Sequence, residues 1–128
     1  MPADDFWPAD LTNTSNITTP VSMMREQAAL LGQKTNQQLT ATVVPMTTGG
    51  GEFVWSFQLI STILVNYRYE LFRVSHTITL YPAVFYWEAH PTSKVVASQD
   101  DFKSYMKEII GSDQTKKIVQ GLLAQIIK

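Results

Sequence analysis

The sequence predicts an α+β fold: a four-stranded antiparallel meander with an N-terminal helix and two C-terminal helices packed on one face, as a two-layer sandwich. Between residues 39 and 89, side chains alternate with period two, and β-branched and aromatic residues are frequent. On both sides of this segment, apolar residues recur at helical spacing. Consecutive strands with short connections pair antiparallel, and helices at both chain ends most simply cover one sheet face.

The length and composition indicate one globular domain. The chain has 128 residues, of which 45% are hydrophobic and 16% charged, with a net charge of −1. A charge this close to zero gives no general attraction to nucleic acid or to anionic membrane. The absence of cysteine excludes disulfides, thiolate metal sites and thiol catalysis. We expect residues 1–18 to be an extended arm and residues 19–128 to be a single α+β domain.

The arm is polar but carries three large apolar side chains, Phe6, Trp7 and Leu11. An aromatic pair is costly to leave in water, so these residues are expected to pin the arm to the domain. The alternative is an exposed peptide that docks on a partner. The start of the chain is acidic and broken by prolines, so we expect no secretory signal there.

Capping residues mark the expected helices. Thr19 is a good N-cap, and Pro20 suits the first helical position because its missing N–H would have no partner there. A second helix is expected to start at Ser98 or Asp100 and to stop at Gly111. The third helix follows to the end of the chain. The apolar face of the first helix comprises Val21, Met24, Ala28 and Leu31.

The four strands are expected at about residues 39–44, 52–60, 67–79 and 83–89. Pro45 limits the first strand to an edge or ends it, and Pro91 ends the last strand. Glycines make residues 47–51 a turn, while the connection at residues 61–66 has only Asn66 as a turn-former. In the third strand the apolar residues stand at odd-numbered positions up to Leu71 and at even-numbered positions from Phe72 onward. This change of face predicts a bulge or a bend at Leu71-Phe72.

The last hairpin would place several polar side chains together. If it turns at residues 81–82, His76 lies opposite Trp87 and Arg73 lies opposite His90. His76 would then share the apolar face, where a hydrogen-bonded core histidine is the expected role rather than a catalyst. Glu88 would lie diagonal to Arg73, and the alternative to a binding site there is a solvated surface ion pair.

Six side chains form the candidate binding surface, which is expected on the open face of the sheet. This surface is here called the sheet-face set. Its members are Arg68, Tyr69, Arg73, Tyr86, Glu88 and His90. Aromatic and arginine side chains of this kind anchor protein interfaces. They could also stack on nucleic-acid bases, but the slightly acidic chain makes a nucleic-acid partner unlikely on sequence grounds.

We expect the protein to be a small cytoplasmic interaction module, with a toxin-neutralising, chaperone-like or adaptor role and no catalytic activity. The chain has no nucleophile motif or metal-ligand spacing, so no catalytic residue, metal or cofactor is assigned. No apolar run is long enough to span a membrane. The partner would be another protein or a second copy bound through the last helix. The apolar residues of that helix are Ile118, Val119, Leu122, Leu123, Ile126 and Ile127.

The alternative function is a small-ligand binder or a minor enzyme that uses the polar cluster on the sheet. An acid, a base and a phenol side by side can hold a small polar molecule or transfer a proton. The residues that would do so are Arg73, His76, Tyr86, Glu88 and His90.

Overall fold

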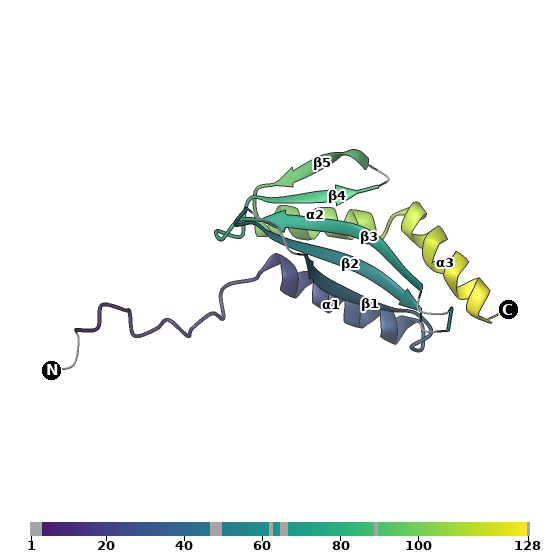
Figure 1. Cartoon of the computed structure of the whole chain (residues 1–128), viewed down its shortest axis with the longest axis horizontal. Helices are drawn as coiled ribbons and strands as arrows, with labels where there is room; N and C mark the ends of the chain where they lie inside the picture. Colours follow the sequence, from purple (N-terminus) through teal and green to yellow (C-terminus); the bar gives the residue numbers. More distant parts are fainter. Residues whose placement is uncertain (1–3, 47–49, 62, 65–66, 89, 128) are drawn as a thin grey trace.

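The computed structural model describes residues 4–46, 50–61, 63–64, 67–88 and 90–127 (Figure 1). The turn predicted at residues 47–51 and the connection predicted at residues 61–66 therefore lie partly outside the described residues. The elements are, in chain order, α1 (Pro20–Lys34), β1 (Thr40–Met46), β2 (Phe53–Ser61), β3 (Tyr67–His76), β4 (Ala83–Trp87), β5 (His90–Val96), α2 (Gln99–Ile110) and α3 (Asp113–Ile127).

The sheet is an antiparallel meander of five strands in the order β1-β2-β3-β4-β5, not of four. The predicted α+β class is confirmed, and the strand count is corrected. The missed strand is β5, because Pro91 is predicted to end the fourth strand and no further strand is expected beyond it. β5 lies at the edge of the sheet, where a proline is tolerated since no neighbour needs its missing N–H. β1 forms the other edge and continues through Pro45 for the same reason.

The predicted capping residues mark the start of α1 and both ends of α2. Thr19 Oγ1 accepts a hydrogen bond from the Ser22 backbone N–H at 3.1 Å, and Pro20 is the first helical residue. Ser98, not Asp100, caps α2 by accepting from the Asp101 N–H at 3.2 Å. Gly111 then ends α2. Figure 1 shows α1 and α2 behind the sheet, while α3 lies at the far end of the molecule from the arm.

The core lies between the sheet and these helices. Phe72, Phe85 and Phe102 are almost fully buried and contact one another from β3, β4 and α2. Their ring centroids lie 5.7 Å apart for Phe72 and Phe85, and 4.7 Å apart for Phe85 and Phe102. Phe57 stacks on Phe72 at 4.9 Å. Stacked and tilted aromatic contacts of this kind stabilise a core beyond the area that they bury.

The predicted bulge in β3 is confirmed. Phe57 pairs with Phe72, but the next residue of β2, Gln58, pairs with Glu70, so Leu71 is the extra residue. Leu71 and Phe72 both contribute to the core. Upstream of the bulge, Tyr69 pairs with the buried Leu59, so Tyr69 shares the helix-covered face.

The register of the β3–β4 hairpin differs from the expected one by four residues. His76 pairs with Ala83 rather than with Trp87, and Arg73 pairs with Tyr86 rather than with His90. The reason is a longer connection over residues 77–82, in which the Leu80 N–H donates to the Thr77 carbonyl at 3.0 Å. A shift by an even number keeps the paired side chains of β3 and β4 on their expected faces.

The described part of the arm, residues 4–18, extends away from the domain (Figure 1). The prediction that its apolar residues pin it to the domain is wrong. Phe6 is 92% exposed and Trp7 is 74% exposed, and Leu11 is exposed as well. The base of the arm is held, because the Tyr81 hydroxyl donates to the Thr18 carbonyl at 3.1 Å.

Candidate functional site

The open face of the sheet carries a chain of hydrogen-bonded polar side chains. Arg68 Nη1 donates to Gln58 Oε1 at 3.0 Å, and Gln58 Nε2 donates to Ser56 Oγ at 3.1 Å. The buried Ser56 hydroxyl donates to Glu70, whose Oε2 also accepts from Arg73 Nη2 at 3.1 Å. The bulge brings Arg68, Glu70 and Arg73 to the same face. Arg73 and Glu70 neutralise each other, and Arg68, which bonds the neutral Gln58, leaves one positive charge on this network.

The sheet-face set does not form a single cluster. Arg73 and the exposed Tyr86 are cross-strand partners on the open face, and they line an open hollow of about 360 Å³ with Glu70. The partner of Arg73 is Glu70, not the expected Glu88, since the ion pair forms within β3. The expected cross-strand pair is therefore wrong.

Three members of the sheet-face set, Tyr69, Glu88 and His90, lie apart from Arg73. Tyr69, on the helix-covered face, donates its hydroxyl to Glu88 Oε2 at 3.3 Å. Partial burial and, next, the nearby Glu88 carboxylate raise the pKa of the Tyr69 phenol. His90 pairs with Trp87 at the β4–β5 turn, and its Nδ1 contacts the Thr92 carbonyl at 2.8 Å. The sheet-face set as a whole is therefore divided between the two faces of the sheet and one turn.

His76 has the structural role that the sequence favoured. It is 6% exposed, its Nε2 accepts from Trp55 Nε1–H at 3.0 Å, and its Nδ1 lies 2.7 Å from the Thr77 carbonyl. Both ring nitrogens are thus engaged in structural hydrogen bonds. A ring held in this way has no free nitrogen to accept a proton from a substrate.

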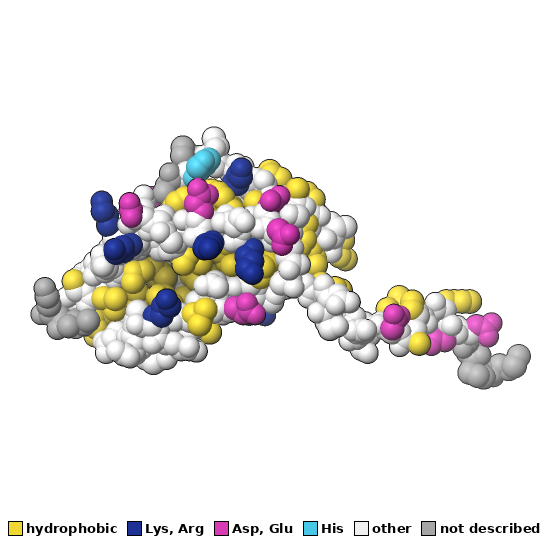
Figure 2. All heavy atoms as spheres, turned by 180° about the vertical axis from the view of Figure 1, so that it is seen from behind, with side chains coloured by type: hydrophobic (Ala, Val, Ile, Leu, Met, Phe, Trp, Pro, Cys, Tyr) yellow, Lys and Arg dark blue, Asp and Glu magenta, His cyan; other side chains and the backbone are white. Residues whose placement is uncertain are grey.

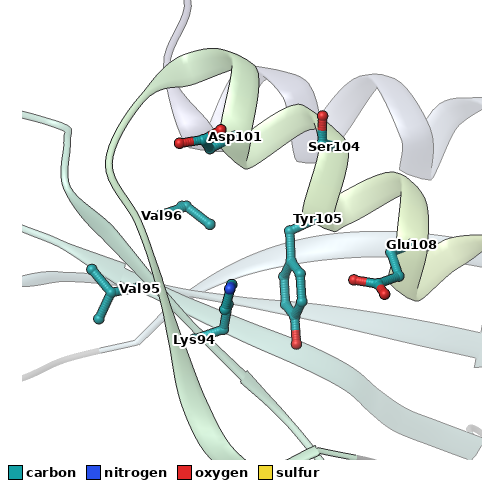
Figure 3. Close-up of a pocket in the computed structure, with 7 residues that line it drawn as sticks. All are labelled: Lys94, Val95, Val96, Asp101, Ser104, Tyr105 and Glu108. Carbon is teal, nitrogen blue, oxygen red and sulfur yellow. The ribbon is translucent and has the colours of Figure 1, made fainter.

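An open hollow of about 550 Å³ lies between β5 and α2 (Figure 3). In this view Lys94 and Tyr105 point into the space between the two elements, and Val95 points away from it. Asp101 and Glu108 line the helical side. Partial burial and then the Glu108 carboxylate raise the pKa of the Tyr105 phenol. The lining mixes one lysine with two carboxylates, so it selects neither charge strongly.

A second concave surface has a different character. Between α1 and the start of α3, a groove of about 430 Å³ reaches down to the sheet, and its floor is formed by Phe57, Leu59 and Leu71. The half-buried Leu31 and Val119 form its apolar walls. A hollow of about 420 Å³ continues it along α2 past Met106. The two share Gln27, Ile110 and Gly111, and together they are called the interhelical groove.

Four lysines line the interhelical groove. They are Lys34 of α1, Lys103 and Lys107 of α2, and Lys116 of α3, and all four are exposed. No aspartate or glutamate is among the lining residues. Within the described ranges, none of these lysines makes an ion pair. Figure 2 shows hydrophobic side chains reaching the surface of the helical layer with Lys and Arg side chains beside them.

Sequence reasoning identified the parts of this groove but not the groove. The sequence predicts the apolar residues of the last helix as a docking surface for a partner. Of these residues, Leu122 is buried, and Ile118, Val119, Leu123 and Ile126 stay partly exposed. The four lysines come from three helices, so only the tertiary structure brings them to one surface.

No cluster of three or more metal-ligating His, Asp or Glu side chains occurs in the part of the chain that the structure describes. In the same ranges, no helix has the length and apolar character needed to cross a bilayer. No protein-family model, curated protein or solved structure compared with this chain matches it. The functional inference therefore rests on the geometry of this chain.

Proposed function

We propose that this protein is an interaction module that binds an acidic, partly apolar segment of a polypeptide in its interhelical groove. The observation that carries the proposal is the combination of an apolar floor with four exposed lysines and no lining carboxylate. Toxin neutralisation, chaperoning and assembly are all compatible with such a site, and the proposed setting is the cytoplasm.

The two features of the groove select different parts of such a segment. Apolar side chains gain about 25 cal/mol per Å² when they leave water, so the half-buried walls, Leu31 and Val119, favour aromatic and aliphatic anchors above the buried floor. The lysines steer carboxylates towards the rim and discriminate against basic segments. The lysine stems can also cover apolar groups of the ligand.

The sheet-face set supports a small-ligand function less well. Its charged groups already bond within the protein, as Arg73 does to Glu70 and Glu88 does to Tyr69. A ligand there would have to displace these contacts. We still predict that the sheet-face set is a second surface for contact with another protein.

Peptide binding tests the proposal. The full chain is titrated into a fluorescent synthetic peptide that alternates acidic and aromatic residues, and anisotropy is measured at low and high salt. Two charge reversals, Lys107→Glu and Lys116→Glu together, should weaken binding about tenfold, because two attractions of up to about 1 kcal/mol become repulsions. The matched control is Lys117→Glu, which changes an exposed neighbour on α3 that does not line the groove.

A second variant tests the apolar part of the site. Val119→Thr keeps the side-chain shape but puts a hydroxyl on the groove wall, so affinity should fall while high salt changes the size of this effect little. Equal binding by the wild type, the double reversal and Val119→Thr would overturn the proposal. A peptide with lysine in place of each acidic residue should not bind.

A further inference from the structure

The arm is itself an acidic, partly apolar segment. Residues 4–18 contain Asp4, Asp5 and Asp10 and no Lys or Arg. Among these carboxylates stand Phe6 and Trp7, which are the most exposed aromatic side chains of the described residues, at 92% and 74%. A pair of aromatic residues in this state gains free energy from any apolar surface that covers it.

The charges of the arm and of the domain are opposite. Three of the eleven carboxylates lie in the arm, and all ten Lys and Arg residues follow it, so residues 19–128 carry ten positive and eight negative charges. The arm is therefore −3 and the domain +2, although the whole chain is near neutral. The interhelical groove concentrates four of the domain's positive charges around an apolar floor. Arm and groove are complementary in both charge and polarity.

The exit of the arm directs it away from the groove of its own chain. The Thr18 carbonyl is bonded to Tyr81, and Thr19 caps α1, so the arm leaves from the first turn of that helix. The α1 residues that line the groove, Gln27, Leu31 and Lys34, lie in the second half of α1. Figure 1 shows the arm running away from the domain, on the side opposite α3.

We propose that two copies of this chain exchange arms, so that Phe6 and Trp7 of each copy dock in the interhelical groove of the other. The proposal rests on the proposed function and names the partner segment. The aspartates of the arm then lie near the lysine rim, and the apolar floor receives the two rings. Four aromatic side chains would bury roughly 600–1,000 Å². The groove surface that the rings cover adds to this area.

Sedimentation velocity of the full chain over a wide concentration range tests the proposal. A concentration-dependent dimer is expected. Phe6→Ala and Trp7→Ala together should raise its dissociation constant at least about tenfold, and so should Lys107→Glu with Lys116→Glu. The matched controls are Ile17→Ala, at an exposed residue near the base of the arm, and Lys117→Glu, outside the groove. Neither control should change the dimer.

Mixing the two defective variants gives the sharpest test. The arm variant retains an intact groove, and the groove variant retains an intact arm, so one productive exchange is possible in the mixture and none in either variant alone. Dimer that reappears on mixing supports the proposal. Failure to reappear, although the wild type dimerises, would show that the arm of one copy and the groove of the other are not partners and would overturn the proposal.

Two further results would also overturn the exchange. One is a monomer at every concentration whose Trp7 emission changes with the groove reversals, which would place the arm in its own groove. The other is a monomer that is indifferent to all variants. In either case, binding of the synthetic acidic peptide decides separately whether the groove is a docking site. The proposed function thus fails if that peptide does not bind, or if it binds the wild type and the groove variants equally.

Discussion

Trp55 donates its indole N–H to Nε2 of His76 across β2 and β3, with 3.0 Å between the two nitrogens. The Thr77 carbonyl, 2.7 Å from Nδ1, can only accept. Nδ1 must therefore carry the ring proton and Nε2 must be bare, because an indole N–H is a donor only. The two contacts select one neutral tautomer and fix the orientation of the ring.

Removal of the indole donor should destabilise the fold. Trp55→Phe leaves the buried Nε2 of His76 without a partner, and the unfolding free energy should fall by about 1–3 kcal/mol. Urea denaturation measures this change. ¹⁵N shifts of the wild-type imidazole should show a protonated Nδ1 and an unprotonated Nε2. Trp87→Phe, at a partly buried position of the same sheet, is the control and should cost less; equal losses would mean that the hydrogen bond contributes nothing.

Alkaline pH should weaken the fold through three phenols. Burial raises the pKa of Tyr81, and burial is also the largest cause of the raised pKa of Tyr69 and Tyr105. A raised native pKa means that the unfolded chain loses the proton first. The stability from these phenols is therefore complete below about pH 10 and is lost as the pH rises through the native pKa values.

The contribution of Tyr81 can be isolated. Tyr81→Phe removes the group that titrates, so its unfolding free energy should decline less steeply above about pH 10 than that of the wild type. Lysines titrate in the same range and affect both proteins alike, so the difference between the two curves is the measured quantity. Parallel curves would show that the Tyr81 phenol has the same pKa in the folded and unfolded chain.

Two glycines should respond in opposite directions to the same substitution. Gly121 lies inside α3 with nothing within 4 Å of an added Cβ, so Gly121→Ala should stabilise the protein by about 0.5–1 kcal/mol through helix propensity. Gly51 also has open space, but its φ is +72°, so Gly51→Ala should destabilise. Thermal unfolding distinguishes the two; a gain at both positions would show that space rather than backbone conformation decides.

The open sheet face should tolerate truncation better than the core. Arg73→Ala breaks an exposed ion pair with Glu70, and such pairs are worth about 0–1 kcal/mol. Tyr86→Ala removes a half-exposed ring from the same face. Both variants should stay within about 1 kcal/mol of the wild type, whereas Phe72→Ala, in the core, should lose about 3–5 kcal/mol. Unfolding of Arg73→Ala or Tyr86→Ala at room temperature would place these residues in the core.

The fold class, the helix caps and the bulge were predictable because each depends on residues close together in the sequence. Thr19 with Pro20 and Ser98 with its acidic first turn act locally, as does the parity change at Leu71. β5 was missed because a local rule about Pro91 depends on a non-local fact, namely whether a neighbouring strand lies on both sides.

The candidate site was predictable only in part, for the same reason. The sheet-face set assumed one hairpin register, and the six-residue connection over residues 77–82 changed which residues meet. The interhelical groove gathers Lys34 of α1 with Lys107 and Lys116 of α2 and α3, which lie far from α1 in the sequence. The spacing of apolar residues predicts which face of each helix is buried. The space left between the helices depends on how they pack against one another.

The bulge makes Leu71 unlike every other residue of β3. Since Glu70 already pairs with Gln58, and Phe72 with Phe57, the ladder continues past Leu71 as though it were not there. Deletion of Leu71 would leave a regular strand in which each remaining side chain keeps its present side, whereas deletion of a residue elsewhere in β3 exchanges inside and outside for part of the strand. The strand thus has one position at which a residue can be lost without exchanging its buried and exposed faces. That position contributes a side chain to the groove floor.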